Sequence, residues 1–162
     1  MRKFVLDSDC LIKLTKVGAL DALVKSAACF VPKEVFEEVV IVGKRLLYKD
    51  AEEISRIVEQ GRIQVVQVVC QPHPALGKGE VAVKELAKKV RSDAVLSDDR
   101  RFLSELESEG IAFMNSAQMI VWLKGIKAIT HNNALMMIER LRPFIGEGSY
   151  QTAITMIGGK RT

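Results

Sequence analysis

The chain has 162 residues, of which 48% are apolar and 27% are charged, a composition that is ordinary for one globular domain with a continuous core. It holds no apolar run of about 18 residues that could span a membrane. The N-terminus reaches its first acid at Asp7 and so lacks the pattern of a secretory signal. We therefore expect a soluble, cytoplasmic protein without a membrane partner. The net charge of +4 permits a polyanionic partner but does not require one.

Few side chains are suited to a soft or histidine-rich metal site. Cys10, Cys29 and Cys70 are widely spaced and lie mostly among apolar neighbours. This favours reduced thiols over a disulfide set or a zinc knuckle. The chain also has only two histidines, which argues against a metal site built on imidazole.

A strand followed by a helix is predicted at the start of the chain. RKFVL is short, apolar and β-branched, and it ends at Asp7. After it, apolar residues recur at helical spacing, at Leu11, Leu14 and Val17. A second helix, ALDALVKSA, then leads to the short strand CFV.

The middle of the chain is predicted to be mainly helical. Pro32 suits the first turn of a helix, KEVFEEVVIVGKR, which should bury Val35, Val39 and Val42. Residues 49–60 form another amphipathic helix, and RIQVVQVV has the apolar, β-branched content of a strand. The loop CQPHPALGKG then leads to the helix EVAVKELAKKV.

The last third of the chain continues the alternation. AVLS reads as a buried strand, followed by a helix at 101–109, the strand IAFM and the helix SAQMIVWLKGI. Two further helices, NNALMMIERLRPFI and SYQTAITMI, have no strand after them. Alternating strands and helices are typical of a parallel sheet covered on both faces. We predict a three-layer α/β/α fold for residues 1–127 and a helical extension, residues 128–162, packed on the same domain.

Acidic side chains follow predicted strand ends. Asp7 and Asp9 come after the first strand, and Asp98 and Asp99 come after AVLS. Both pairs lie at one edge of the sheet if these strands are neighbours, and ligands bind at such edges. Glu80 opens a helix directly after a Gly-Lys-Gly loop, whose glycines let the backbone approach a ligand closely.

A fourth acidic position, Glu38, lies one helical turn after Val35 and can point toward the same edge. Four acids at one edge repel each other unless a cation neutralises them. Oxygen ligands without histidine or cysteine favour Mg²⁺ or Mn²⁺. Such ions polarise a phosphodiester and lower the pKa of a bound water, which indicates phosphodiester hydrolysis.

Each of these acids also has a purely structural interpretation. Asp7 or Ser8 could cap the next helix, and Asp9 could lie in its first turn, where the helix dipole favours acids. Glu80 suits a first helical turn for the same reason. One residue of the pair that follows AVLS could cap the next helix. It is the joint placement of these residues, more than any one of them, that indicates a site.

Four motifs, in order, resemble those of the PIN domain family. FVLDSDCLIKLTKVGALDALVK resembles the opening strand and helices, and it carries the first family acid onto Asp7. FVPKEVFEEV resembles the Val-Pro helix and carries the second onto Glu38 in preference to Glu37. LGKGEVAVKELAKK carries the third onto Glu80, and AVLSDDRRF carries the fourth onto Asp98, Asp99 or both. The resemblance covers residues 3–125.

The resemblance implies a fold, an activity and partners. It implies a parallel sheet flanked by helices and a Mg²⁺- or Mn²⁺-dependent endoribonuclease that cuts single-stranded RNA. Members are RNA-processing enzymes or toxins of toxin–antitoxin pairs, so an antitoxin and a second copy in a homodimer are implied partners. Ser8, Asp9 and Ser97 are expected to support the acids. Asp9 replaces a small polar residue, and Ser97 stands where threonine is common.

Four cations near the acids are candidates to contact phosphate, although each could equally be a solvated charge. They are Lys13, Lys78, Arg100 and Arg101. The alternative function is a PIN-like module that binds nucleic acid or protein with little turnover. A flavodoxin-like phosphoacceptor ranks last, because it would need a lysine after IAFM, where Asn115 stands.

Overall fold

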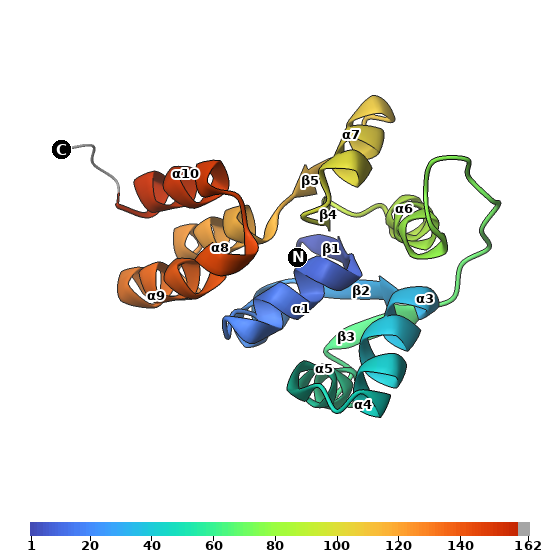
Figure 1. The fold of residues 1–162 in the computed structure, drawn as a ribbon, viewed down its shortest axis with the longest axis horizontal. Coiled ribbons are helices and arrows are strands. Elements are labelled where there is room, and N and C mark those ends of the chain that lie inside the picture. Colours follow the sequence, from blue (N-terminus) through green and yellow to red (C-terminus); the bar gives the residue numbers. More distant parts are fainter. Residues whose placement is uncertain (159–162) are drawn as a thin grey trace.

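The computed structural model describes residues 1–158, and its centre is one sheet of short strands (Figure 1). The strands are β1 Lys3–Leu6, β2 Ala28–Pro32, β3 Ile63–Val66, β4 Ala94–Leu96 and β5 Phe113–Met114. Their order in the sheet is β3-β2-β1-β4-β5, and every neighbouring pair is parallel. The strands are apolar because both faces of the sheet are covered, and Val5, Leu6 and Val95 are fully buried.

Helices connect the strands and cover both faces of the sheet. Their bounds are α1 Ser8–Lys16, α2 Leu20–Ser26, α3 Lys33–Phe36, α4 Gly43–Arg45, α5 Lys49–Glu59, α6 Lys78–Val90, α7 Arg100–Ser108, α8 Ser116–Gly125, α9 His131–Leu141 and α10 Glu147–Gly158. A π-helical turn, η1 Glu37–Val42, joins α3 to α4, and a 3-10 turn, η2 Arg142–Phe144, follows α9. Helix α1 contacts α2, α5 and α8, whereas α6 lies across β1, β2 and β4 on the other side (Figure 1). The predicted three-layer α/β/α architecture is confirmed.

The segment after Pro32 departs from the regular helix that the pattern predicted. Its central part is π-helical, so each turn there holds an additional residue and the buried face shifts. Val35 and Val39 are buried as predicted, but Val40 takes the next inward position. Val42 is 45% exposed, so the prediction that it is buried is wrong.

The two helices after residue 128 pack on this chain. Helices α9 and α10 contact α8 and each other, and the three form one group beside the sheet (Figure 1). Ile138, Leu141 and Ile157 are buried at these contacts. Residues 159–162 of the predicted extension lie outside the described residues. No helix within residues 1–158 has the length and apolar content needed to cross a membrane.

Candidate active site

The strand order reverses between β1 and β4, which lie side by side. The chain runs from β1 outward to β2 and β3 in one direction, and from β4 to β5 in the other. Leu6 pairs with Leu96, and the Asp7 N–H donates to the Leu96 carbonyl at 2.9 Å. The segments that follow β1 and β4 therefore start at one edge of the sheet, as the sequence predicted. Ligands of open α/β sheets bind at such a reversal.

Asp7 is held through both carboxylate oxygens. Its Oδ1 accepts a 2.9 Å hydrogen bond from the Ser8 N–H and caps α1. Its Oδ2 accepts a 2.9 Å hydrogen bond from the hydroxyl of Ser97, which is fully buried. The Ser97 hydroxyl in turn accepts from the Asp99 N–H at 3.3 Å. The capping interpretation is thus correct for Asp7, and the same contacts fix its carboxylate at the end of a rigid strand.

The electrostatics of Asp7 show that two other acids are near it. Burial raises the pKa of Asp7 from 3.8 to about 6, although the hydrogen bonds from Ser97 and Ser8 lower it. The negative charges of Glu80 and Glu38 raise this pKa further. We call Asp7, Glu38 and Glu80 the acidic group. Ser8 links the first two, because its N–H donates to Asp7 and its hydroxyl donates to Glu38.

Glu38 comes from the π-helical turn and faces the starts of two helices. Its Oε2 accepts a 2.9 Å hydrogen bond from the Ser8 hydroxyl at the start of α1. At the start of α6, a Cβ built on Gly79 would lie 4.0 Å from the same oxygen. Glu37 and Glu38 are both exposed, but Glu37 pairs with Lys33 at 3.6 Å. Of the two candidates for the second acid, only Glu38 thus joins the contacts around Asp7.

Glu80 has a structural contact as well as a place in the acidic group. It is the third residue of α6, and its Oε2 accepts a 3.1 Å hydrogen bond from the Gly77 N–H. This capping contact holds the side chain over the first turn of the helix. From this position, the negative charge of Glu80 raises the pKa of Asp7.

Asp98 and Asp99 have different surroundings. The Asp98 side chain is 9% exposed, and its Oδ1 accepts from the Ser116 N–H at 2.8 Å and from the Ser116 hydroxyl at 3.0 Å. Its Oδ2 is buried and accepts no hydrogen bond within residues 1–158. Asp99 is exposed and caps α7 by accepting from the Phe102 N–H at 3.1 Å. Of the pair, it is therefore Asp98 that carries a buried carboxylate at the edge of the sheet.

Lys13 is the one candidate cation that is bound to these acids. Its ammonium lies 2.8 Å from Asp9 and 3.4 Å from Asp98 Oδ2, and its side chain is 14% exposed. Burial lowers the pKa of Lys13, but the two carboxylates outweigh this and hold the pKa above its usual value. Lys13 thus neutralises Asp98 and is not free for phosphate. The other three candidate cations are exposed, namely Lys78, Arg100 and Arg101.

Sequence reasoning missed Ser116, which holds Asp98 through two hydrogen bonds. A signal for it exists, because Ser116 is the second residue after β5 and polar residues after neighbouring parallel strands meet at one edge. The adjacency of β4 and β5 is needed to use that signal.

The chemistry of these side chains fits a hard divalent cation. All the donors are oxygens, and the acids near Asp7 carry excess negative charge. Among the described residues, no three histidine, cysteine, aspartate or glutamate side chains converge as in a formed metal site. Asp7, Glu38 and Glu80 would therefore have to draw closer to bind one ion jointly.

Comparisons with known proteins agree with this fold. The model of the family DUF3368, described as a PIN domain, matches residues 3–158, which include α9 and α10. A search of curated proteins found no match. A solved structure from Methanocaldococcus jannaschii DSM 2661, "a domain of a functionally unknown protein", is 18% identical with a TM-score of 0.50. The similarity covers 71% of this chain and 91% of that one, and it concerns the fold alone. On the family match, the chain belongs to the PIN domain family.

Proposed function

We propose that the protein is a Mg²⁺- or Mn²⁺-dependent endoribonuclease that hydrolyses phosphodiester bonds of single-stranded RNA. PIN domains are a nuclease-type superfamily, and nucleic acid is their general substrate. The observation that carries the proposal is the environment of Asp7. Its largely buried carboxylate lies at the reversal of strand order, where burial, and to a smaller extent repulsion by Glu80 and Glu38, raises its pKa to about 6. A cation at this place would relieve that repulsion.

In this proposal, Asp7, Glu38 and Glu80 hold the ion. Ser97 and Ser8 orient the first two acids through hydrogen bonds of 2.9 Å, which fixes their donor oxygens before substrate binds. A divalent ion held by these residues would supply Lewis-acid chemistry, which polarises a phosphodiester and lowers the pKa of a bound water.

Asp98 and Asp99 have supporting parts in the same proposal. Asp98 joins the segment after β4 to α1 and α8, because Lys13 and Ser116 both contact its carboxylate. Asp99 caps α7 and so orders the segment that carries Asp98.

Cleavage of a labelled single-stranded RNA tests the proposal. We expect cutting with Mg²⁺ or Mn²⁺, none with chelator, and a loss of about 100-fold or more in Asp7→Asn and Glu80→Gln. Glu107→Gln removes an exposed acid of α7 and should cut like the wild type. Cutting that survives chelator, or that is equal in all three variants, would contradict the proposal.

A second candidate is a PIN-like module that binds nucleic acid or protein with little turnover. It is favoured by the absence, among residues 1–158, of three acids that already converge on one point. Titration with Mn²⁺ distinguishes the two candidates. A folded protein that binds RNA but neither binds Mn²⁺ nor cuts RNA would support the binding module.

A toxin role and a homodimer both need a surface for another protein. Apolar side chains are exposed in and directly after the π-helical turn that carries Glu38: Ile41, Val42, Leu46, Leu47 and Tyr48. We propose that this apolar segment meets a second copy of the chain in a homodimer. Light scattering should give the mass of a dimer for the wild type and of a monomer for Leu47→Ser combined with Ile41→Ser. A monomeric wild type would overturn this proposal.

A further inference from the structure

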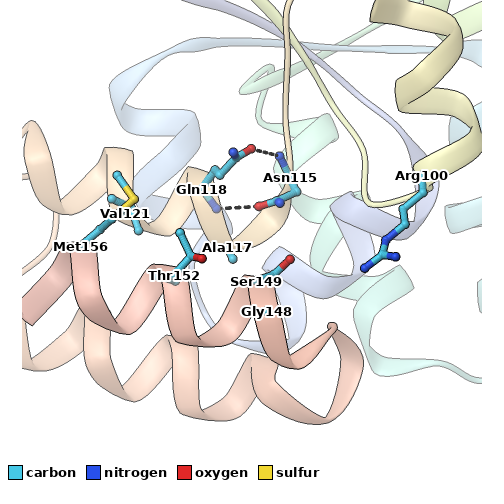
Figure 2. Close-up of a pocket in the computed structure, with 10 residues that line it drawn as sticks. Arg100, Asn115, Ala117, Gln118, Val121, Gly148, Ser149, Thr152 and Met156 are labelled. Carbon is cyan, nitrogen blue, oxygen red and sulfur yellow. Dashed lines mark hydrogen bonds between the residues drawn. The ribbon is translucent and has the colours of Figure 1, made fainter.

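A cavity of about 350 Å³ lies between α8 and α10, beside the candidate active site. Figure 2 shows the side chains that line it. We infer that this cavity binds one unpaired nucleotide of the RNA strand that is cut at the Asp7 site. The inference rests on the proposed function, because it assigns part of the substrate to a second place on the same protein.

The first argument for this inference is the position of the cavity. Two of its lining residues, Arg100 and Asn115, are close in sequence to the Asp98 contacts. Arg100 follows Asp98 by two residues, and Asn115 directly precedes Ser116, which donates to Asp98 at 2.8 Å and 3.0 Å. An RNA strand that leaves the candidate active site past β4 and β5 would therefore reach the mouth of the cavity next.

The second argument is the distribution of charge in the lining of the cavity. The lining holds one cation, Arg100, and no acid, and within residues 1–158 Arg100 forms no ion pair. Its guanidinium lies near the loop before α10, since a Cβ built on Gly146 would be 3.5 Å from it. An unpaired guanidinium at the mouth of a cavity free of acids favours a phosphate there.

The opposite end of the cavity has a different character. Figure 2 places Arg100 at one end and the apolar side chains of Val121 and Met156 at the other, with Thr152 between them. A nucleotide has the same division, with a charged phosphate at one end and a flat base at the other. Bases of single strands bind on such apolar surfaces because they are not stacked in a helix.

Two fixed amides give the cavity hydrogen-bonding groups. Asn115 Oδ1 accepts from the Gln118 N–H at 2.8 Å, and Gln118 Oε1 accepts from the Asn115 N–H at 2.9 Å (Figure 2). These contacts hold both side chains in place and leave the two amide NH₂ groups without a partner in the described part of the chain. They can donate to the carbonyl or ring nitrogen acceptors of a base.

The size of the cavity limits the ligand. At about 350 Å³, it is at the small end of the range for ligand pockets in proteins. It is suited to one nucleotide and too small for a base pair, so an unpaired strand fits it.

The test measures RNA binding without cleavage. A fluorescein-labelled single-stranded RNA of ten nucleotides is titrated with protein in chelator, and anisotropy gives the Kd. Thr152→Trp fills the cavity without a change of charge, and Thr155→Trp places the same ring on an exposed site of α10 outside the cavity. Arg100→Ala removes the cation of the cavity, and Arg56→Ala removes an exposed cation of α5 outside it.

We expect Thr152→Trp and Arg100→Ala to raise Kd by about 10-fold, and both matched controls to change it by less than about 2-fold. The inference is overturned if Thr152→Trp binds as tightly as Thr155→Trp, or if Arg56→Ala weakens binding as much as Arg100→Ala. It is also overturned if the wild type does not bind the RNA.

The chelator keeps this result separate from the proposed nuclease activity. A protein that cuts RNA with Mg²⁺ but whose Kd is insensitive to Thr152→Trp retains the proposed function and loses the cavity inference. A protein that never cuts, but whose Kd responds to both cavity variants and to neither control, retains the cavity as an RNA site and loses the nuclease.

Discussion

The ammonium of Lys13 lies 3.4 Å from Asp98 Oδ2, and the two side chains are only 14% and 9% exposed. This contact joins the middle of α1 to the segment after β4. Because Oδ2 accepts no hydrogen bond within residues 1–158, Lys13 is its main compensating charge. A largely buried carboxylate that loses such a partner keeps the full cost of leaving water.

Lys13→Met should therefore lower the free energy of unfolding by about 2 kcal/mol, since Asp98 keeps only its contacts with Ser116. Urea denaturation measures the change. Lys25→Met is the matched control. Lys25 pairs with Asp21 at i,i+4 spacing, as Lys13 pairs with Asp9, but Lys25 is exposed. It should cost no more than about 0.5 kcal/mol. Equal losses in the two variants would contradict the importance of the buried pair.

Asp7→Asn should stabilise the metal-free protein at pH 8. A carboxyl whose pKa is raised from 3.8 to about 6 on folding binds its proton more tightly in the native state. Its ionisation therefore destabilises the native state above pH 6, and this effect disappears below pH 3.8. At pH 8 the variant should gain about 1–3 kcal/mol, and the gain should shrink as the pH falls from 6 to 4. Urea denaturation in chelator at pH 8 and at pH 4 measures the difference in the free energy of unfolding between the variant and the wild type. A variant less stable than the wild type at pH 8 would contradict the inference that the ionised Asp7 carboxylate destabilises the native state.

Ser97→Ala should shift the pH dependence of RNA cleavage. The Ser97 hydroxyl lowers the pKa of Asp7, so its removal should raise this pKa further and move the acid limb of the rate profile to higher pH. Ser97→Thr keeps a hydroxyl and should restore the wild-type limb. Cleavage rates between pH 5 and 9 measure the shift. If alanine and threonine behaved alike, the hydroxyl would have no part in setting the charge of Asp7.

Mn²⁺ should stabilise the folded protein in a concentration-dependent way. At a free concentration of about 100 times Kd, a ligand of the native state alone adds about 2.7 kcal/mol. Thermal melts with Mn²⁺ should therefore move to higher temperature, and chelator should reverse the shift. Asp7→Asn and Glu38→Gln should lose the response, whereas Glu107→Gln, outside the acidic group, should keep it. An unchanged melting temperature in the wild type would argue against a metal site at this edge.

The sequence by itself determined the class of the fold. Short apolar segments such as RKFVL and AVLS alternate with amphipathic helices, and such local periods survive folding because each element must bury one face. The same reasoning placed Asp7 at a strand end and Glu80 at a helix start, where the structure has them. The resemblance to the PIN domain family, argued from four ordered motifs, is confirmed by the family match over residues 3–158.

Only the tertiary structure decided which side chains meet. The neighbourhood of β1 and β4 depends on strand pairing between distant segments, and it brings Ser97 to Asp7. The neighbourhood of β4 and β5 likewise brings Ser116 to Asp98. The π-helical turn that exposes Val42 is also invisible in a pattern that assumes a constant helical period. A local pattern specifies which face of an element is buried, whereas the partner of each polar group is selected by contacts across the whole fold.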